Sequence, residues 1–290
     1  MSGNFFARAW NSVRRRMGGK LTSFRKSVSR IRYGKNIYLV YTMGKVGTTT
    51  ISQFFKKEHP ELISFHLHYL SDFWLKEKLP SLHPIYHVQI KDAQEALDTM
   101  AKFPNLRLKI FTMVREPIDR EISIIFQNWQ GLFNVNSINE LSEEEVVHYL
   151  NEHTDENALS WFDTEFKAFL DFDIYALPFD KEKGYTIYHR EHADILCMTT
   201  EKLNSCLQRA MKEFTGMNIT GLSSANKTED REGKELYKLL KKNYTAPVEK
   251  LKLLYNSKHI GHFYSEKEIE VFVKKWSHGE TNYSDIKNAV

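Results

Sequence analysis

The stretch YLVYTMGKVGTTTISQFF (residues 38–55) changes its period halfway, and this change decides the fold. It begins with mostly apolar residues, as a buried strand does, and becomes helical from about Thr48. Between the two patterns lies a loop with Lys45 between Gly44 and Gly47. A loop that leaves a strand and opens a helix presents backbone N–H groups and the positive end of the helix dipole. We therefore predict that this first loop, residues 42–50, holds a phosphate or sulfate group.

Each residue type in the first loop has a part in that prediction. The glycines let the backbone approach an anion, Lys45 adds a full charge, and the threonines add hydroxyl donors. The predicted anion-binding residues are Lys45, Val46, Gly47, Thr48, Thr49 and Thr50. The Walker pattern G-x-x-x-x-G-K-[ST] does not match, because the lysine precedes the second glycine and only two residues separate the glycines. A glycine turn with threonine caps is the alternative.

A second loop, VREPIDREIS (residues 114–123), also follows a strand pattern and opens a helix. Arg115 stands at the carboxyl end of that strand, where open α/β sheets bind ligands. Ser123 lies eight residues further on, so a guanidinium and a hydroxyl can hold one phosphate from two sides. For Arg120 two interpretations stay open: it assists Arg115, or it pairs with Glu116 or Asp119 on the surface.

Strand and helix patterns alternate along the chain, which favours a parallel sheet with helical crossovers. Strands are predicted at residues 37–42, 62–68, 107–114, 174–179, 185–189 and 193–198. Helices are predicted at residues 48–57, 92–102, 117–129, 142–151, 201–214, 228–255 and 266–276, with a frayed tail after 278. The helix signals are Asp92 as an N-cap, a capping box from Ser142 to Glu145, a stop at Gly216 and a new start at Pro247. We expect an α/β domain, residues 37–290, with a P-loop-like central parallel sheet flanked by helices and an α-rich C-terminal part.

Charge is distributed unevenly along the 290 residues. The net charge is +4, yet residues 1–36 contain ten Lys or Arg and no acid. This basic N-terminal arm fits a peripheral contact with an anionic membrane, a transit peptide or a solvated arm. No apolar run is long enough to span a bilayer, and Cys197 and Cys206 form no C-x-x-C. We expect a cytoplasmic protein with buried packing cysteines, and the arm alone is a weak argument for nucleic-acid binding.

The two loops together resemble those of sulfotransferases that use 3′-phosphoadenylyl sulfate (PAPS). In that family a lysine followed by Gly-Thr-Thr holds the 5′-phosphosulfate, and a segment R-x-P-x-x-R-x-x-S holds the 3′-phosphate. TMGKVGTTT and the run from Arg115 to Ser123 fit these patterns. The chain also resembles the bacterial family of "putative capsular polysaccharide synthesis" proteins through YTMGKVGTTTI, VREPIDREIS, FDKEKGY and HFYS.

The resemblance implies transfer of sulfate from PAPS to a hydroxyl, on a glycan or another acceptor, without a metal. Lys45 would stabilise the leaving group, and a histidine would act as base. His66 and His68, two apart at a strand end, share a face, and paired histidines of this kind in glycan 2-O-sulfotransferases favour His68 over His66. Asn226 and Lys227 correspond to a late loop that touches the nucleotide, although a surface turn is an equal interpretation.

Several alternatives stay open at this point. His87 and Glu95 are further candidate bases. His189-x-x-His192 and His259-x-x-His262 have metal-like spacing without a third ligand, so we interpret them as structural. The aromatic group Phe126, Trp129 and Phe133 is interpreted as core, with contact to a sugar or to adenine as the alternative. Other functions are a nucleotide-dependent kinase with a variant P-loop, or a non-catalytic nucleotide-binding protein of polysaccharide assembly.

Overall fold

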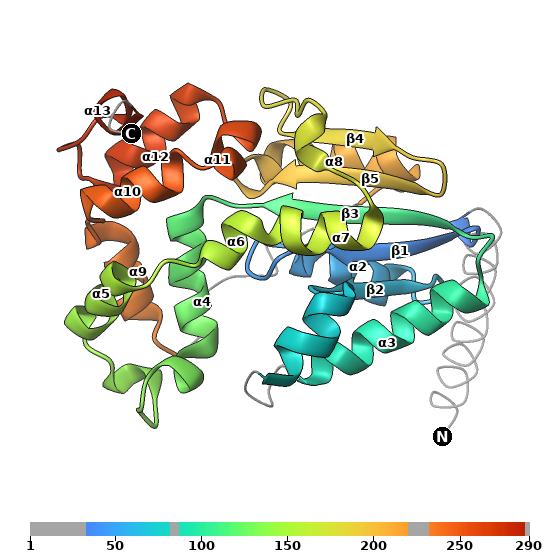
Figure 1. Ribbon diagram of the computed structural model, residues 1–290, viewed down its shortest axis with the longest axis horizontal. Helices are drawn as coiled ribbons and strands as arrows, with labels where there is room; N and C mark the ends of the chain where they lie inside the picture. Colours follow the sequence, from blue (N-terminus) through green and yellow to red (C-terminus); the bar gives the residue numbers. More distant parts are fainter. Residues whose placement is uncertain (1–32, 82–86, 220–231, 288–290) are drawn as a thin grey trace, which may run out of the picture.

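The fold is built on a five-stranded sheet, seen in a computed structural model that describes residues 33–81, 87–219 and 232–287 (Figure 1). The strand order is β2-β1-β3-β5-β4. The strands are β1 (Asn36–Tyr41), β2 (Ser64–Leu67), β3 (Arg107–Val114), β4 (Tyr185–His189) and β5 (Ala193–Thr199). β1, β2, β3 and β5 are parallel, whereas β4 pairs antiparallel with β5 at one edge. The predicted α/β class is confirmed, with a sheet that is mostly parallel.

Helices surround the sheet and make up most of the C-terminal third. They are α2 (Thr49–Glu58), α3 (His87–Lys102), α4 (Pro117–Leu132), α5 (Glu143–Glu152), α6 (Glu156–Trp161), α7 (Lys167–Leu170), α8 (Leu203–Thr215), α9 (Lys234–Asn243), α10 (Val248–Tyr255), α11 (Lys258–Phe263), α12 (Glu266–Trp276) and α13 (Tyr283–Lys287). Shorter helical turns are η1 (Phe73–Lys78), η2 (Leu79–Ser81), η4 (Ile138–Glu140), η5 (Phe162–Phe166), η6 (Ile174–Ala176) and η7 (Thr200–Lys202). In Figure 1 the orange and red helices α9–α13 gather at one end of the sheet, near α4.

Successive side chains of a strand point to opposite sides of the sheet, so each face presents its own set of residues. Different helices cover the two faces. On one face Phe55 of α2 packs on Tyr38 and Phe111, and Phe111 meets Phe214 of α8. On the other face Tyr41 packs against the aromatic rings of residues 161–169, in the segment that crosses the sheet in Figure 1. The core therefore lies on both sides of the central strands.

Local signals predicted several helix ends well. The capping box of Ser142 and Glu145 is formed, and α8 ends at Gly216 in the left-handed conformation. Pro247 precedes α10 as its N-cap residue. Asp92, in contrast, lies inside α3, which begins at His87, so its prediction as an N-cap is wrong.

Two other predictions of secondary structure are wrong. Residues 174–179 form no strand, because the Asp173 side chain accepts the Tyr175 N–H and starts a short helical turn, and Pro178 has no N–H to give a ladder. Residues 283–287 form α13 with Ile286 buried, where a frayed tail was expected. The predicted arm falls almost wholly outside the described residues. Within those residues, no helix has the length and apolar character to cross a bilayer.

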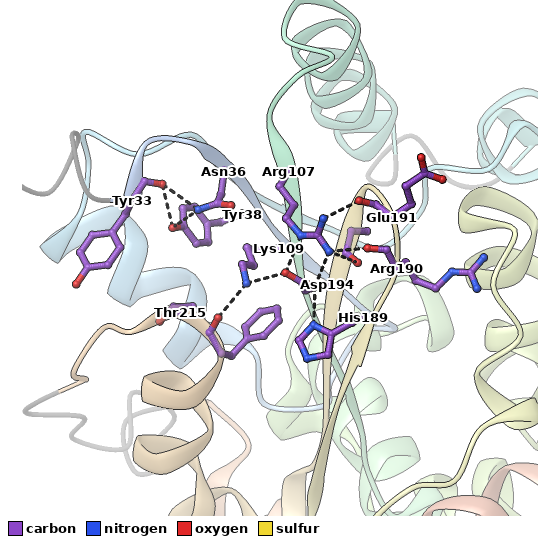
Figure 2. Close-up of polar contacts among 12 residues, drawn as sticks. Tyr33, Asn36, Tyr38, Arg107, Lys109, His189, Arg190, Glu191, Asp194 and Thr215 are labelled. Atoms are coloured by element: carbon purple, nitrogen blue, oxygen red, sulfur yellow. Dashed lines mark hydrogen bonds and ion pairs between the residues drawn. The ribbon is translucent and has the colours of Figure 1, made fainter.

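Asp194 of β5 ties together the amino ends of the central strands (Figure 2). It is 5% exposed and accepts from Arg107 Nε at 2.8 Å, Lys109 Nζ at 2.8 Å and His189 Nδ1 at 2.8 Å. Arg107 also donates to the carbonyls of residues 190 and 191. The hydrogen bonds from Arg107, followed by those from Lys109 and His189, hold the pKa of Asp194 well below its usual range. This cluster joins β3, β4 and β5 at the end of the sheet opposite the carboxyl ends.

We expect Asp194→Asn to lower the free energy of unfolding by about 1–3 kcal/mol at pH 7, because two cations then face a neutral amide. Since the carboxyl pKa is depressed on folding, its contribution is complete above about pH 4 and is lost as the pH falls further. Urea unfolding of both proteins between pH 3 and 7 measures this. The control Asp72→Asn removes an exposed i,i+4 pair with Lys76 and should cost about 0.5 kcal/mol or less. An equal loss in both variants would contradict the prediction.

Candidate functional site

A cavity of about 530 Å³ lies at the carboxyl ends of the parallel strands. The first loop, the end of β2, the second loop, α4 and the start of α9 contribute to its wall. Its lining residues are Lys45, Gly47, Thr48, Thr49, His66, His68, Arg115, Ser123, Phe126, Gln127, Glu232, Lys234 and Tyr237. Two loops predicted from separate motifs and the predicted histidine pair therefore share one cavity.

Arg115 joins the two loops directly. Its Nη1 donates to the Lys45 carbonyl at 3.0 Å and to Ser123 Oγ at 3.0 Å. Ser123 Oγ in turn lies 3.3 Å from the hydroxyl of Tyr237 in α9. A guanidinium has five N–H donors, and these two contacts use Nη1 alone. Arg115 also hydrogen-bonds the Tyr237 side chain, and it lines the cavity while it fixes the loops.

The first loop has an unusual backbone whose carbonyls accept hydrogen bonds from side chains elsewhere in the chain. Lys45 adopts φ +67°, a left-handed conformation that few residues with a β-carbon take, and Gly47 follows at φ +89°. Arg120 Nε holds the Gly44 carbonyl at 2.8 Å, beside the bond from Arg115 to Lys45. The hydroxyl of Thr200, after β5, holds the Val46 carbonyl at 2.6 Å and the Val114 carbonyl at 2.9 Å. Three successive carbonyl oxygens are thereby withdrawn from ligand contact, as an anion site requires.

The histidine pair is kept in its neutral form. Burial, with smaller effects from His68 and Lys56, lowers the pKa of His66 from 6.5 to about 4. Burial also lowers the pKa of His68, as do the charges of Arg120 and Lys45, while a hydrogen bond to the Thr42 carbonyl opposes them. That bond, 2.6 Å from Nδ1, requires the proton on Nδ1 because a carbonyl only accepts. His68 Nε2 therefore carries a lone pair, as a general base needs.

Contacts on both sides of His68 fix its position. Its ring lies 5.2 Å from that of His66, whose Nε2 is 3.1 Å from Thr48 Oγ1. Thr48 makes no side-chain cap bond to α2, so the alternative of a capping threonine does not hold at this residue. The Trp161 indole donates to the His68 carbonyl at 3.0 Å, and the buried Glu165 carboxylate accepts the Ser71 N–H at 3.0 Å. Residues 161–166 therefore support the segment that follows the candidate base.

The C-terminal helices support the second loop. Glu116, next to Arg115, is buried and caps α4 by accepting from the N–H groups of residues 118 and 119. It also accepts from the Tyr255 hydroxyl at 2.5 Å and the Trp276 indole at 3.0 Å. Glu201 accepts the Glu116 N–H at 2.9 Å and the Tyr264 hydroxyl at 2.7 Å. Burial, and next the charge of Asp119, raises the pKa of Glu116 to about 7.

The sequence did not predict the contributions of α9 and of Gln127 in α4. Tyr237 reaches Ser123, and Lys234 and Glu232 line the cavity beside it. Gln127 also lines the cavity, and so does Phe126, whose ring meets that of Tyr237 at 5.1 Å. Nothing in the charged helical pattern of residues 234–243 separates these positions from an ordinary surface helix.

Other predicted residues lie elsewhere. Val46 is buried and Thr50 lies outside the cavity lining, although both belong to the first loop. His87 and Glu95 are exposed on α3 and do not line the cavity. Asn226 and Lys227 fall outside the described residues.

Of the two interpretations of Arg120, the surface pairing with Glu116 or Asp119 is wrong. Arg120 is 7% exposed, and its Nη1 binds Asp155 at 2.7 Å. Asp119, one of the two partners considered for it, instead pairs with Lys241 and Lys275. The REPIDR pattern thus has one arginine that faces the cavity and one that is enclosed.

Among the remaining candidates, both cysteines are buried and free. His189 pairs with Asp194, and His259 Nδ1 lies 3.2 Å from the Tyr175 hydroxyl. Across residues 33–81, 87–219 and 232–287, no three or more His, Cys, Asp or Glu are grouped to hold a metal ion.

The fold and the cavity together define an α/β protein with a basic ligand cleft at the carboxyl edge of its sheet. Residues 134–265 match the model of the NKWYS family, described as "Putative capsular polysaccharide synthesis protein". This supports the capsular-polysaccharide resemblance over less than half of the chain, and both loops precede the matched range. Comparison with curated proteins found no match, and neither did comparison with solved structures.

We expect both cavity histidines to titrate below the ordinary value in the folded protein. His66 should change its ring chemical shifts near pH 4, and His68 below pH 6.5, because burial disfavours the imidazolium. NMR titration measures this, with the His66→Gln and His68→Gln spectra assigning the two signals. The urea-unfolded chain is the reference at about 6.5. Titration of His66 at the reference pH in the folded protein would contradict the expectation.

Proposed function

We propose that this protein is a sulfotransferase that moves sulfate from PAPS to a hydroxyl group of a glycan. The observation that carries the proposal is Arg115 Nη1, bonded to both Lys45 O and Ser123 Oγ. This contact joins the loop that we assign to the 5′-phosphosulfate and the pair that we assign to the 3′-phosphate, and both line one cavity with His66 and His68. A ligand with a phosphate at each end, such as PAPS, is the chemistry that two adjacent anion sites favour.

The fit of the residues to PAPS follows from their charges and donors. Lys45, the hydroxyls of Thr48 and Thr49 and the N-terminal end of α2 would hold the 5′-phosphosulfate. Arg115 and Ser123 would hold the 3′-phosphate, with the Tyr237 hydroxyl next to Ser123. The rings of Phe126 and Tyr237 line the same cavity and offer apolar contact for the adenosine.

The chemical step needs a base and a stabilised leaving group. His68 Nε2 would accept the proton of the acceptor hydroxyl while the acceptor oxygen forms its bond to sulfur. The bond between sulfur and the bridging phosphate oxygen breaks in the same step, and Lys45 would stabilise the charge left on that oxygen. Transfer resembles phosphoryl transfer, in which positioning and charge stabilisation supply most of the catalysis.

The acceptor class is argued from the family comparison. The matched family is described by capsular polysaccharide synthesis, and a polysaccharide offers the hydroxyl groups that this reaction requires. Gln127 lines the cavity and provides an amide that can hydrogen-bond sugar hydroxyls. A surface polysaccharide is therefore the acceptor that we propose.

We expect adenosine 3′,5′-bisphosphate to raise the melting temperature by several degrees without magnesium, because a ligand of the folded state stabilises it. Thermal unfolding with 1 mM ligand measures this, and ATP with magnesium should have a smaller effect. Arg115→Ala should lose the response while remaining folded. Arg209→Ala removes an exposed arginine from α8 and should keep the response. Strong stabilisation by ATP with magnesium and none by the bisphosphate would replace this proposal with a kinase.

We expect His68→Ala to lower the rate of sulfate transfer by about 10²–10⁴-fold, the range of general base catalysis. Transfer of labelled sulfate from PAPS to a panel of polysaccharides measures the rate. Nucleotide binding should persist, since His68 is assigned to the acceptor side. Wild-type activity should be retained below pH 6.5 because the His68 pKa is lowered, and it should fall as more acidic pH protonates Nε2. Full activity of His68→Ala with loss in His66→Ala would reassign the base.

A further inference from the structure

Arg120 connects the first loop to the start of α6. Its Nε donates to the Gly44 carbonyl at 2.8 Å, and its Nη1 donates to Asp155 Oδ2 at 2.7 Å. The side chain is 8% exposed, so water competes little for these contacts. One guanidinium thus holds a carbonyl of the first loop and a carboxylate far along the chain.

The carboxylate partner is itself fixed by a buried pair. The Asp155 N–H donates to Glu121 Oε1 at 2.9 Å, and Glu121 Oε2 lies 2.6 Å from Lys250 Nζ. Lys250, from α10, also donates to the carbonyls of residues 150 and 153. Both Glu121 and Lys250 are buried. A continuous chain of hydrogen bonds and ion pairs therefore connects Lys250 of α10, through α4 and residue 155, to the Gly44 carbonyl.

Holding a carbonyl also fixes the next N–H. The C=O and N–H of a trans peptide point in opposite directions within one plane. Arg120 on the Gly44 carbonyl therefore sets the direction of the Lys45 N–H, and Arg115 on the Lys45 carbonyl sets that of the Val46 N–H. Lys45 needs this support because its φ of +67° is unfavourable for a residue with a β-carbon.

We propose that Arg120 is a positioning residue, which holds the first loop in the shape that binds the 5′ end of the nucleotide. Arg115 faces the cavity and serves the 3′-phosphate, whereas Arg120 acts from behind the loop and touches no ligand. The inference rests on the proposed function, and it separates the roles of two arginines in one motif. It predicts a loss at one end of the nucleotide only.

The experiment measures the dissociation constants of three nucleotides by calorimetry. The probes are adenosine 3′-phosphate, adenosine 5′-phosphate and adenosine 3′,5′-bisphosphate. The gain in affinity from 3′-phosphate to bisphosphate reports the 5′ site, and the gain from 5′-phosphate to bisphosphate reports the 3′ site. In Arg120→Lys the 5′ gain should fall about tenfold, as expected for one lost hydrogen bond to a charged group, while the 3′ gain is unchanged. Hydrogen exchange of residues 43–48 should also rise.

Two further variants keep the test decisive. Asp155→Asn retains the shape of the side chain but weakens its bond to Arg120, so it should lower the 5′ gain about threefold. If Arg120→Lys fails to fold, the result for Asp155→Asn tests the inference. Asp194→Asn weakens the opposite end of the sheet and should leave both gains unchanged. The inference is overturned if the 5′ gain is unchanged in the Arg120 and Asp155 variants, or if both gains fall equally. In either case the proposed function is not affected. Failure of the wild-type protein to bind the bisphosphate overturns the proposed function and this inference together.

Discussion

The site depends on three consecutive carbonyl oxygens, those of Gly44, Lys45 and Val46, each held by a side chain from another strand end. The donors follow β3 and β5, whereas the carbonyls follow β1. They can meet because β1, β3 and β5 are adjacent and parallel, so their carboxyl ends lie at one edge. These bonds help to offset the unfavourable left-handed backbone conformation of Lys45. The sheet order is thus what makes the first loop possible.

The helical C-terminal part has a structural task at the same edge. Tyr255 and Trp276 bond to the Glu116 carboxylate, and Tyr264 bonds to Glu201, which holds the Glu116 backbone. Most of these supports fall within residues 134–265, the range that matches the capsular-polysaccharide family. The matched range therefore contains parts that hold the second loop in place, while the two loops themselves lie outside it.

The sequence predicted what local chemistry determines. β3 and α12 have the same bounds as the predicted strand 107–114 and helix 266–276. Both could be predicted because the spacing of apolar residues and the capping residues are local features of the sequence. The meeting of Arg115 and Lys45 was also predictable, since adjacent parallel strands end together. Tyr237 was not, because its contact with Ser123 spans 114 residues and depends on the packing of α9 on α4. The burial of Arg120 could not be predicted for the same reason, because its contact with Asp155 also depends on tertiary packing.

The positive charges around the cavity both attract an anion and disfavour protonation of His68. Lys45 and Arg120 favour an anion, and the same charges help to lower the pKa of His68. These charges hold the pKa of His68 below its ordinary value, which favours an unprotonated Nε2. On the proposed function, a bound phosphosulfate brings negative charge close to Lys45 and offsets this effect, which raises the affinity of His68 for a proton. The base would then become a better proton acceptor when the sulfate donor is in place, so donor binding and proton removal reinforce each other.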